Sequence, residues 1–405
     1  MERASRINKS GTRVSRFKGL AISVLSLVVL VSLWTIPQAQ GSISTNKALA
    51  QRASETGAAF AMTNATADNR IIRYSRAADG ALSKVGSIST RGNGIGVDLD
   101  TQGGLRLSSD HRFLYAVNAG SDEITVFSVD GTDLTFLQKV YAGDQPNSLT
   151  IHDDLLYVLD GSVAGNGILG FKVASDGTLT EIPDSFRLLS SPIAVPGQVE
   201  FSPDGRRLLV TEKTTNVLLP PENAIDSYRV RDDGLTSSTP RRIASHGLRP
   251  FSLAFREDDK LVVAESFNAA PGASAVSSYR MTSKGSLRVI SGSVPNRQTD
   301  VCWIVVTDDG RYAFTANFGS GTISSYRFTS TGKVRLIDGK AAFLGLLSQP
   351  VDLALSEDSR YLYLLLRGTG AVAAFEIEDG GGLHSLGVVK GDLPVADGAS
   401  GLAVF

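Results

Sequence analysis

Short runs of alternating apolar and polar residues, separated by glycine-rich turns, fill most of this chain. The stretch 306–334 shows the pattern: it turns at Asp309-Gly310, alternates up to Asn317, turns again at 319–321 and alternates up to Tyr326. Alternation with a period of two between such turns is typical of short antiparallel β-strands. A single hairpin is marginal in water, so this stretch needs partners elsewhere in the chain.

The partners are repeats of the same pattern. An aromatic residue recurs in the same context at spacings of 53, 44, 57, 51, 47 and 49 residues. Its seven copies are Tyr74, Phe127, Phe171, Tyr228, Tyr279, Tyr326 and Phe375. Six of the seven have a glycine six positions later, and a turn such as S-P-D-G-R (202–206) lies upstream. A repeat of about 50 residues with four strand-like segments indicates a β-propeller blade. We therefore predict an all-β, seven-bladed propeller of four-stranded antiparallel blades over residues 56–405.

The end of the chain predicts how the ring closes. Residues 398–405 (G-A-S-G-L-A-V-F) resemble the first strand of a blade, such as P-V-D-L-A-L at 350–355, but no blade follows them. The first copy, from Phe60 to Leu82, lacks that strand. We expect the C-terminal strand to join the N-terminal blade, which would remove two open sheet edges.

The first 50 residues have a different character. Residues 1–18 contain six Lys or Arg and one acid, and residues 19–34 are nearly all apolar and uncharged. A basic region followed by an apolar one predicts an export signal and linker over residues 1–50. The alternative is a short membrane anchor at residues 19–34, although this stretch is short for a spanning helix. We expect an exported protein, periplasmic or secreted, without stable membrane insertion after cleavage.

Composition excludes several classes of function and of site. The formal net charge is −1, and without residues 1–18 it becomes −6, with no basic runs, which argues against nucleic-acid binding. Cys302 is the only cysteine, so an intramolecular disulfide is excluded. None of the four histidines has a second ligand at metal-binding spacing, and no phosphate-binding glycine loop is present. We expect a monomer without metal or cofactor.

Polar residues recur at the end of the second strand of successive copies. They are Asn64, Asn118, Asp160, Glu212, Glu265 and Asn317, and Arg367 follows the same position in the seventh copy. Propeller geometry would bring them to one mouth of the central channel, where they suit an anionic or polyhydroxyl ligand. Asn and Asp are also ordinary turn formers, so a structural role is the alternative for them. Glu is not favoured in strands or turns, which makes the two glutamates the stronger candidates.

A second set of polar residues lies near the start of the first strands. It comprises Ser148, Gln198, Ser252, Trp303, Asp352 and Ser400. Inner strands of a propeller line the channel, so we expect these side chains to face it, and Arg249 could add a positive charge. The alternative is that small polar residues merely allow close strand packing near the axis.

These features resemble one known family. The seven repeats, with S-P-D-G-R-R-L-L-V (202–210) and T-D-D-G-R-Y-A-F (307–314), are similar to the β-propeller lactonases, which include 6-phosphogluconolactonase-like and carboxymuconate cyclase-like proteins. The resemblance implies lactone opening or closing by His, Arg and Glu from different blades. This chain has Gly197 and Gln198 at the His position, Phe251-Ser252 at an Arg-His pair, and Phe318 near a further Arg. Glu265 matches the Glu with a one-residue gap.

Two functions from different classes therefore remain. The first is a lactonase acting on a sugar or small-acid lactone, with Glu265 or Glu212 as general base and Arg249 or Arg367 stabilising the oxyanion. Its ligand-binding set would be Asn64, Asn118, Asp160, Gln198, Ser252 and Asn317. The second is a non-catalytic propeller that binds a ligand or a protein partner on its loop face.

Overall fold

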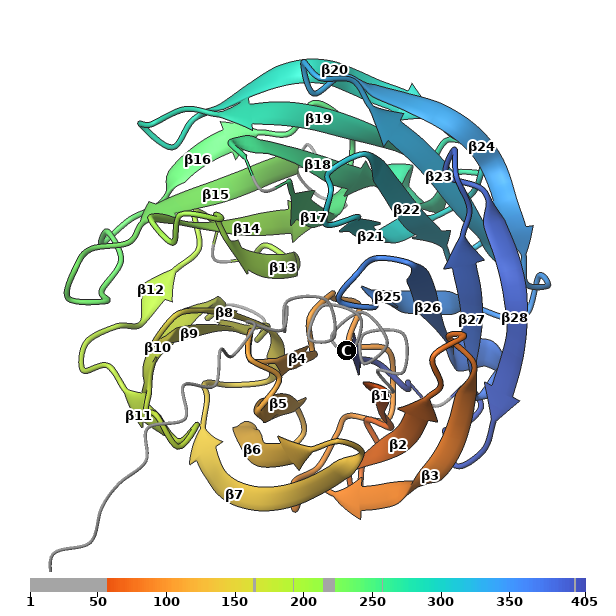
Figure 1. The fold of residues 1–405 in the computed structure, drawn as a ribbon. Helices are drawn as coiled ribbons and strands as arrows, with labels where there is room; N and C mark the ends of the chain where they lie inside the picture. Colours follow the sequence, from red (N-terminus) through yellow and green to blue (C-terminus); the bar gives the residue numbers. More distant parts are fainter. Residues whose placement is uncertain (1–56, 163–164, 192, 214–222, 257, 397) are drawn as a thin grey trace, which may run out of the picture. The chain divides into compact units, whose positions relative to one another are not determined.

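Seven antiparallel sheets arranged as a ring make up the described part of the chain (Figure 1). The computed structural model describes residues 57–405 except 163–164, 192, 214–222, 257 and 397. The predicted export signal lies outside these residues. The seven-bladed propeller predicted from the repeats is confirmed. None of the helical segments in the described part is long and apolar enough to cross a membrane.

Each blade places its first strand innermost and its fourth strand outermost. The first two blades consist of β29 (Leu402–Val404), β1 (Gly57–Met62), β2 (Arg70–Arg76) and β3 (Leu82–Ser89), and of β4 (Leu105–Leu107), β5 (Phe113–Asn118), β6 (Glu123–Asp130) and β7 (Asp133–Tyr141). The third consists of β8 (Pro146–His152), β9 (Leu155–Asp160), β10 (Gly167–Val173) and β11 (Leu179–Glu181) with β12 (Arg187–Leu188). The fourth consists of β13 (Pro196–Phe201), β14 (Arg207–Lys213), β15 (Asn223–Arg229) and β16 (Arg241–Ala244). In the third blade β11 and β12 both pair with β10 and share the outer position.

The remaining blades repeat the same order. Blades five to seven consist of β17 (Pro250–Phe255), β18 (Lys260–Glu265), β19 (Ala275–Met281) and β20 (Leu287–Pro295); β21 (Val301–Val306), β22 (Tyr312–Asn317), β23 (Thr322–Phe328) and β24 (Val334–Phe343); and β25 (Pro350–Leu355), β26 (Tyr361–Leu366), β27 (Ala371–Ile377) and β28 (Leu383–Lys390). Two short 3₁₀ turns, η1 (Phe267–Ala269) and η2 (Arg367–Thr369), follow the second strands of blades five and seven.

The ring closes through the two ends of the fold. β29 pairs antiparallel with β1, with Leu402 opposite Ala61 and Val404 opposite Ala59. The C-terminal strand thus supplies the innermost strand of the N-terminal blade, as the sequence predicted. Through this pairing the C-terminal strand and the N-terminal strands form one four-stranded blade.

The repeated aromatic and glycine positions explain how neighbouring blades fit together. All seven repeated aromatics are buried. Gly80, six residues after Tyr74, has a φ of +83°, and a Cβ there would lie 2.3 Å from Tyr361 of the seventh blade. The hydroxyl of Tyr363 donates to the carbonyl of Gly80 (2.9 Å). Only glycine combines this left-handed backbone with so close an approach, so the repeat marks the joint between blades.

Strand pairing defines two faces of the ring. The start of each first strand lies beside the end of the second strand, as for Pro146 and Asp160. We call this side the connection face, since the segments between blades arrive there. The turns between first and second strands, such as residues 202–206, form the opposite side, which we call the turn face.

Candidate functional site

The polar residues predicted at the ends of the second strands are buried on the connection face. Their side chains hold the segments that lead into the first strands. Asn118 Oδ1 accepts from Thr90 Oγ1 (2.6 Å), and Asp160 accepts from the backbone N–H of Asp144 (3.0 Å). Asn64 donates to the carbonyl of Val97 (2.7 Å). Asn317 makes the same kind of contact by accepting from Asn296 (2.9 Å). The structure therefore gives these residues an anchoring role, and ligand binding by them stays a prediction.

Glu212 is fully buried within the fourth blade. Its carboxylate accepts from Ser190 Oγ (3.1 Å) and from the backbone N–H of Ser191 (3.3 Å). Burial, and after it the negative charge of the neighbouring Asp226, raise its pKa to about 8. The pKa of Asp226 is itself raised by burial. Burial therefore favours the neutral form of both carboxyl groups inside this blade.

Glu265 is enclosed in the same way in the fifth blade. Its two carboxylate oxygens accept from the backbone N–H of Gly247 (2.9 Å) and from Ser293 Oγ (2.8 Å). Burial raises its pKa. The contacts of the described residues bring Glu265 to neither Glu212 nor Arg249, so the two glutamates occupy separate blades rather than one shared pocket.

Residues 97–104, which we call the capping segment, cross the channel on the connection face. The backbone N–H of Gln102 donates to Gly197 of the fourth blade (3.1 Å), and its carbonyl accepts from Ser148 of the third (2.5 Å). Its side-chain amide exchanges two hydrogen bonds of 3.0 Å with the backbone of Ile304 in the sixth blade. A segment tied to inner strands on three sides of the ring closes this mouth.

Both arginines predicted for the site form ion pairs with acidic residues of the capping segment. Arg367 Nη1 lies 2.8 Å from a carboxylate oxygen of Asp98, and Arg249 Nη2 lies 3.4 Å from one of Asp100. The buried Lys213 is 2.8 Å from the same Asp100 oxygen. Burial lowers the pKa of Lys213 and raises that of Asp98. Arg249 and Arg367 thus share one mouth of the channel, where they neutralise the cap.

Below the cap, the channel contains a cavity with two lobes. One lobe encloses about 240 Å³ and the other about 370 Å³. Both are lined by Gln102, Arg106, Val305 and Leu355, so the lobes are neighbours in the channel. The larger lobe reaches the exposed Pro203, and the cavity therefore opens on the turn face.

An ion pair crosses this cavity. Arg106 on β4 places Nη2 at 2.5 Å from a carboxylate oxygen of Glu200 on β13. Glu200 also accepts from Gln198 Nε2 (2.8 Å) and Thr150 Oγ1 (3.0 Å). Gln198, predicted as a ligand-binding residue, therefore orients Glu200, while Ser252 donates to the backbone of Cys302. These contacts fix the Arg106 guanidinium in the channel.

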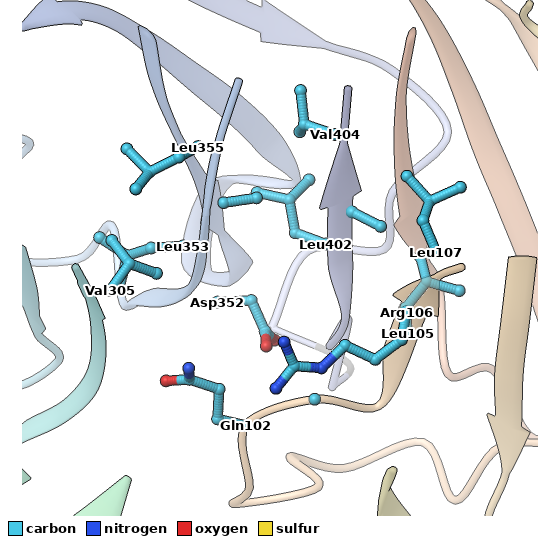
Figure 2. Close-up of a pocket in the computed structure, with 13 residues that line it drawn as sticks. Gln102, Leu105, Arg106, Leu107, Val305, Asp352, Leu353, Leu355, Leu402 and Val404 are labelled. Atoms are coloured by element: carbon cyan, nitrogen blue, oxygen red, sulfur yellow. The ribbon is translucent and has the colours of Figure 1, made fainter. Parts of the chain in front are cut away.

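Asp352 is the second acidic group of the cavity. Figure 2 shows its carboxylate and the Arg106 guanidinium pointing toward one another. One carboxylate oxygen accepts from the backbone N–H of Gly401 (2.6 Å). Burial raises the pKa of Asp352 to about 7, with a contribution from the negative charge of Asp98, while Gly401 and Arg106 lower it. Asp352 therefore gains and loses its proton near neutral pH.

A guanidinium opposite a carboxyl group that titrates near pH 7 can support acid–base chemistry on a polar ligand. The arrangement does not suit a metal. Within the described ranges, no three His, Cys, Asp or Glu side chains cluster in a way that could hold an ion.

Sequence reasoning placed Asp352 in the channel but missed Arg106, Glu200 and the capping segment. A usable signal was present: each of the three cavity residues is a charged residue inside an innermost strand, as in L-R-L (105–107) and V-E-F (199–201). The cap is marked by its length, because the connection between the first two blades has 15 residues (90–104), whereas the other connections between blades have 4 to 11 residues.

The seven-bladed ring of four-stranded antiparallel blades defines the class of protein, a β-propeller. The chain belongs to the family described as "Lactonase, 7-bladed beta-propeller", whose model matches residues 60–195 and 265–343, more than half of the sequence. A search of curated proteins found no significant match.

Solved structures share the fold at low sequence identity. A protein from Lactobacillus plantarum is 19% identical, with a TM-score of 0.66, over 87% of this chain and 98% of its own. A candidate 6-phosphogluconolactonase from Bacteroides fragilis is 18% identical, with a TM-score of 0.64, over 86% and 97%. The periplasmic gluconolactonase of Pseudomonas aeruginosa is 18% identical, with a TM-score of 0.62, over 86% and 99%. At these identities the likeness concerns the fold alone.

Proposed function

We propose that this protein hydrolyses a lactone in the central cavity, with Asp352 as general base and Arg106 as the group that stabilises the oxyanion. The observation that carries the proposal is the facing pair of Arg106 and Asp352 inside the cavity (Figure 2). A general base works best when its pKa lies near the operating pH, and burial raises the pKa of Asp352 to about 7. Membership of the lactonase propeller family supports a lactone as the substrate.

The reaction balances with these residues and water. The ionised Asp352 accepts a proton from water as the oxygen attacks the lactone carbonyl. The negative charge that develops on the carbonyl oxygen is stabilised by the Arg106 guanidinium, which Glu200 holds in place. The bond between the carbonyl carbon and the ring oxygen breaks, the ring oxygen takes up the proton, and a hydroxy acid results. Activity should rise with pH through about 7, as Asp352 ionises.

This assignment differs from the one predicted from the sequence. Glu265 and Glu212 remain the candidates for the general base that the sequence suggested. Both are buried within their blades, so a lactone would have to bind beside β14 or β18 for either to act. Arg249 and Arg367 would then stabilise the oxyanion at the capped mouth. The two assignments predict different outcomes for conservative substitutions, which keep shape and remove charge.

Hydrolysis of a panel of sugar, muconate-type and alkyl lactones tests the proposal. Asp352→Asn should lower kcat by about a hundredfold or more, since a general base typically contributes about 10²–10⁴. Glu265→Gln and Glu212→Gln should stay close to the wild type. Asp379→Asn, on an exposed turn, is the matched control. Wild-type rates no higher than spontaneous hydrolysis, or an Asp352→Asn variant as fast as the wild type, would refute the assignment.

Export is part of the proposed function. The basic and apolar segments of residues 1–50 support it, as does the description of the Pseudomonas aeruginosa neighbour as periplasmic. The N-terminal sequence of the mature protein, isolated from a periplasmic or culture fraction, should begin downstream of residue 34. A chain that stays in the cytoplasmic fraction with its first residue intact would exclude export.

A further inference from the structure

Polar and apolar groups are separated along the central cavity. Asp352, Arg106 and Gln102 lie together at one end, while Leu107, Leu355 and Val404 lie at the other (Figure 2). The strands explain this order, because β25 runs from Asp352 near the cap to Leu355 near the turn face. A ligand that enters from the turn face therefore passes an apolar wall before it meets the acid–base pair.

Most hydrogen-bonding groups in the cavity already have partners. The side chain of Gln102 is bonded to Ile304 through both its oxygen and its nitrogen. Glu200 accepts from Arg106, Gln198 and Thr150. Arg106 is the cationic donor of the cavity: its Nη2 donates to Glu200, while its Nε is enclosed by protein atoms. The cavity thus offers one guanidinium to a ligand with one strong acceptor, but few partners to a ligand with many hydroxyls.

The charges in the cavity disfavour an anionic substituent. Arg106 is the one Lys or Arg among the described lining residues, and Glu200 already neutralises it. Ionised Asp352 makes the local balance negative. A phosphate or carboxylate on the ligand would lose hydration and meet like charge, both of which are costly in a partly buried site.

The larger lobe is walled mainly by aliphatic and aromatic side chains, among them Leu253, Phe255 and Val306. Transfer of apolar groups from water to such a wall is favourable by about 0.8 kcal/mol for each buried methylene. A hydrocarbon substituent on the ligand should therefore bind this wall favourably. A sugar hydroxyl should not, because it would lose its hydrogen bonds to water without gaining new ones.

We infer that the substrate of this site is an uncharged lactone with an alkyl substituent, rather than a sugar lactone or its phosphate ester. The inference rests on the proposed function for the position of the lactone ring. The carbonyl oxygen of the ring meets the Arg106 guanidinium, and the alkyl chain lies along Val305 and Leu355 toward the turn face.

Binding of δ-lactams tests this substrate class without turnover, because an amide ring is not readily hydrolysed. Calorimetry at neutral pH should give a Kd that falls about fourfold for each added methylene of the side chain, which corresponds to about 0.8 kcal/mol. Gluconolactam and its 6-phosphate serve as the competing class. A Kd independent of chain length, or tighter binding of either sugar lactam, would overturn the inference.

A pair of substitutions locates the binding. Val305→Thr keeps the shape of the wall and adds a hydroxyl, and should weaken the longest lactam about tenfold or more while sparing the unsubstituted ring. Val289→Thr, on the exposed face of β20, is the matched control and should leave the series unchanged. Leu355→Asn provides the same test if Val305→Thr does not fold. An unchanged series in both wall variants would overturn the inference.

The two proposals fail separately. Chain-length-dependent lactam binding without hydrolysis of any lactone would remove the catalytic proposal and keep the ligand class. Hydrolysis of sugar lactones that depends on Asp352, without any gain from alkyl chains, would keep the catalytic proposal and remove the ligand class.

Discussion

At the scale of single residues, the acidic side chains of this ring differ in how far burial favours their neutral form. Asp110, on an exposed turn, accepts hydrogen bonds from Ser108 and Arg112, which lower its pKa to about 2. Asp352 and Glu212 lie inside the ring, and burial raises their pKa values to about 7 and about 8. Desolvation thus decides which carboxyl groups can exchange protons near neutral pH.

The raised pKa of Asp352 predicts a pH-dependent stability. A carboxyl group whose pKa is higher in the folded state than in the unfolded state stabilises the fold while protonated. This contribution is present below pH 4 and is lost as the pH rises to about 7. Its size is on the order of 4 kcal/mol, since each pKa unit corresponds to about 1.4 kcal/mol.

Urea unfolding of the wild type and of Asp352→Asn between pH 4 and pH 8 measures this effect. The variant should lose less stability with rising pH than the wild type, and it should be the more stable of the two at pH 8. Glu212 contributes to both proteins equally, so the difference isolates Asp352. Parallel stability curves for the two proteins would show that Asp352 has no raised pKa.

The sequence predicted single residues well where the repeat alone determines them. The third-strand aromatics and the turn glycines follow the period, and all seven aromatics are buried. The glutamates show the limit of such reasoning. Repeat phase placed Glu212 and Glu265 at the ends of second strands, which is correct, but the direction of each side chain depends on the segment that it anchors, such as Gly247 for Glu265.

At the scale of elements, the capping segment is the main departure from seven equivalent blades. Its course depends on contacts with blades far away in the sequence, such as Gln102 with Ile304, 202 positions apart. Local propensity carries no information on such pairs, so only the length of residues 90–104 could have indicated the cap. The cap also explains why the channel opens on the turn face.

The ion pair that holds the cap predicts an asymmetry between two substitutions. Asp100→Asn tolerates the positive φ of this position (54°) but leaves the Lys213 ammonium buried without its carboxylate. A loss of about 3–5 kcal/mol in the free energy of unfolding is expected for such a broken pair. Lys213→Met places an apolar chain over the Phe251 ring, now 4.1 Å from Lys213 Nζ, and leaves Asp100 39% exposed and beside Arg249.

Lys213→Met should therefore destabilise the protein less than Asp100→Asn. Denaturant unfolding of both variants at neutral pH measures the difference. A larger loss for Lys213→Met would mean that the ammonium contributes more through its contact with the backbone carbonyl of Asp100 than through charge.

At the scale of the whole molecule, the number of blades and the closure of the ring were predictable because both are repeated or complementary patterns. Seven copies gave seven sheets, and residues 398–405 supplied the strand that the first copy lacked. The cavity was not predictable in the same way. Arg106, Glu200 and Asp352 come from blades two, four and seven, and only the closed ring brings them together.

The location of the ligand tests the central claim most directly. A crystal structure of the protein with an alkyl-substituted δ-lactam should place the lactam carbonyl beside Arg106, the ring next to Asp352, and the alkyl chain along Val305 toward the turn face. A lactam bound instead at the connection face, among Arg249, Arg367 and the capping segment, would contradict the account.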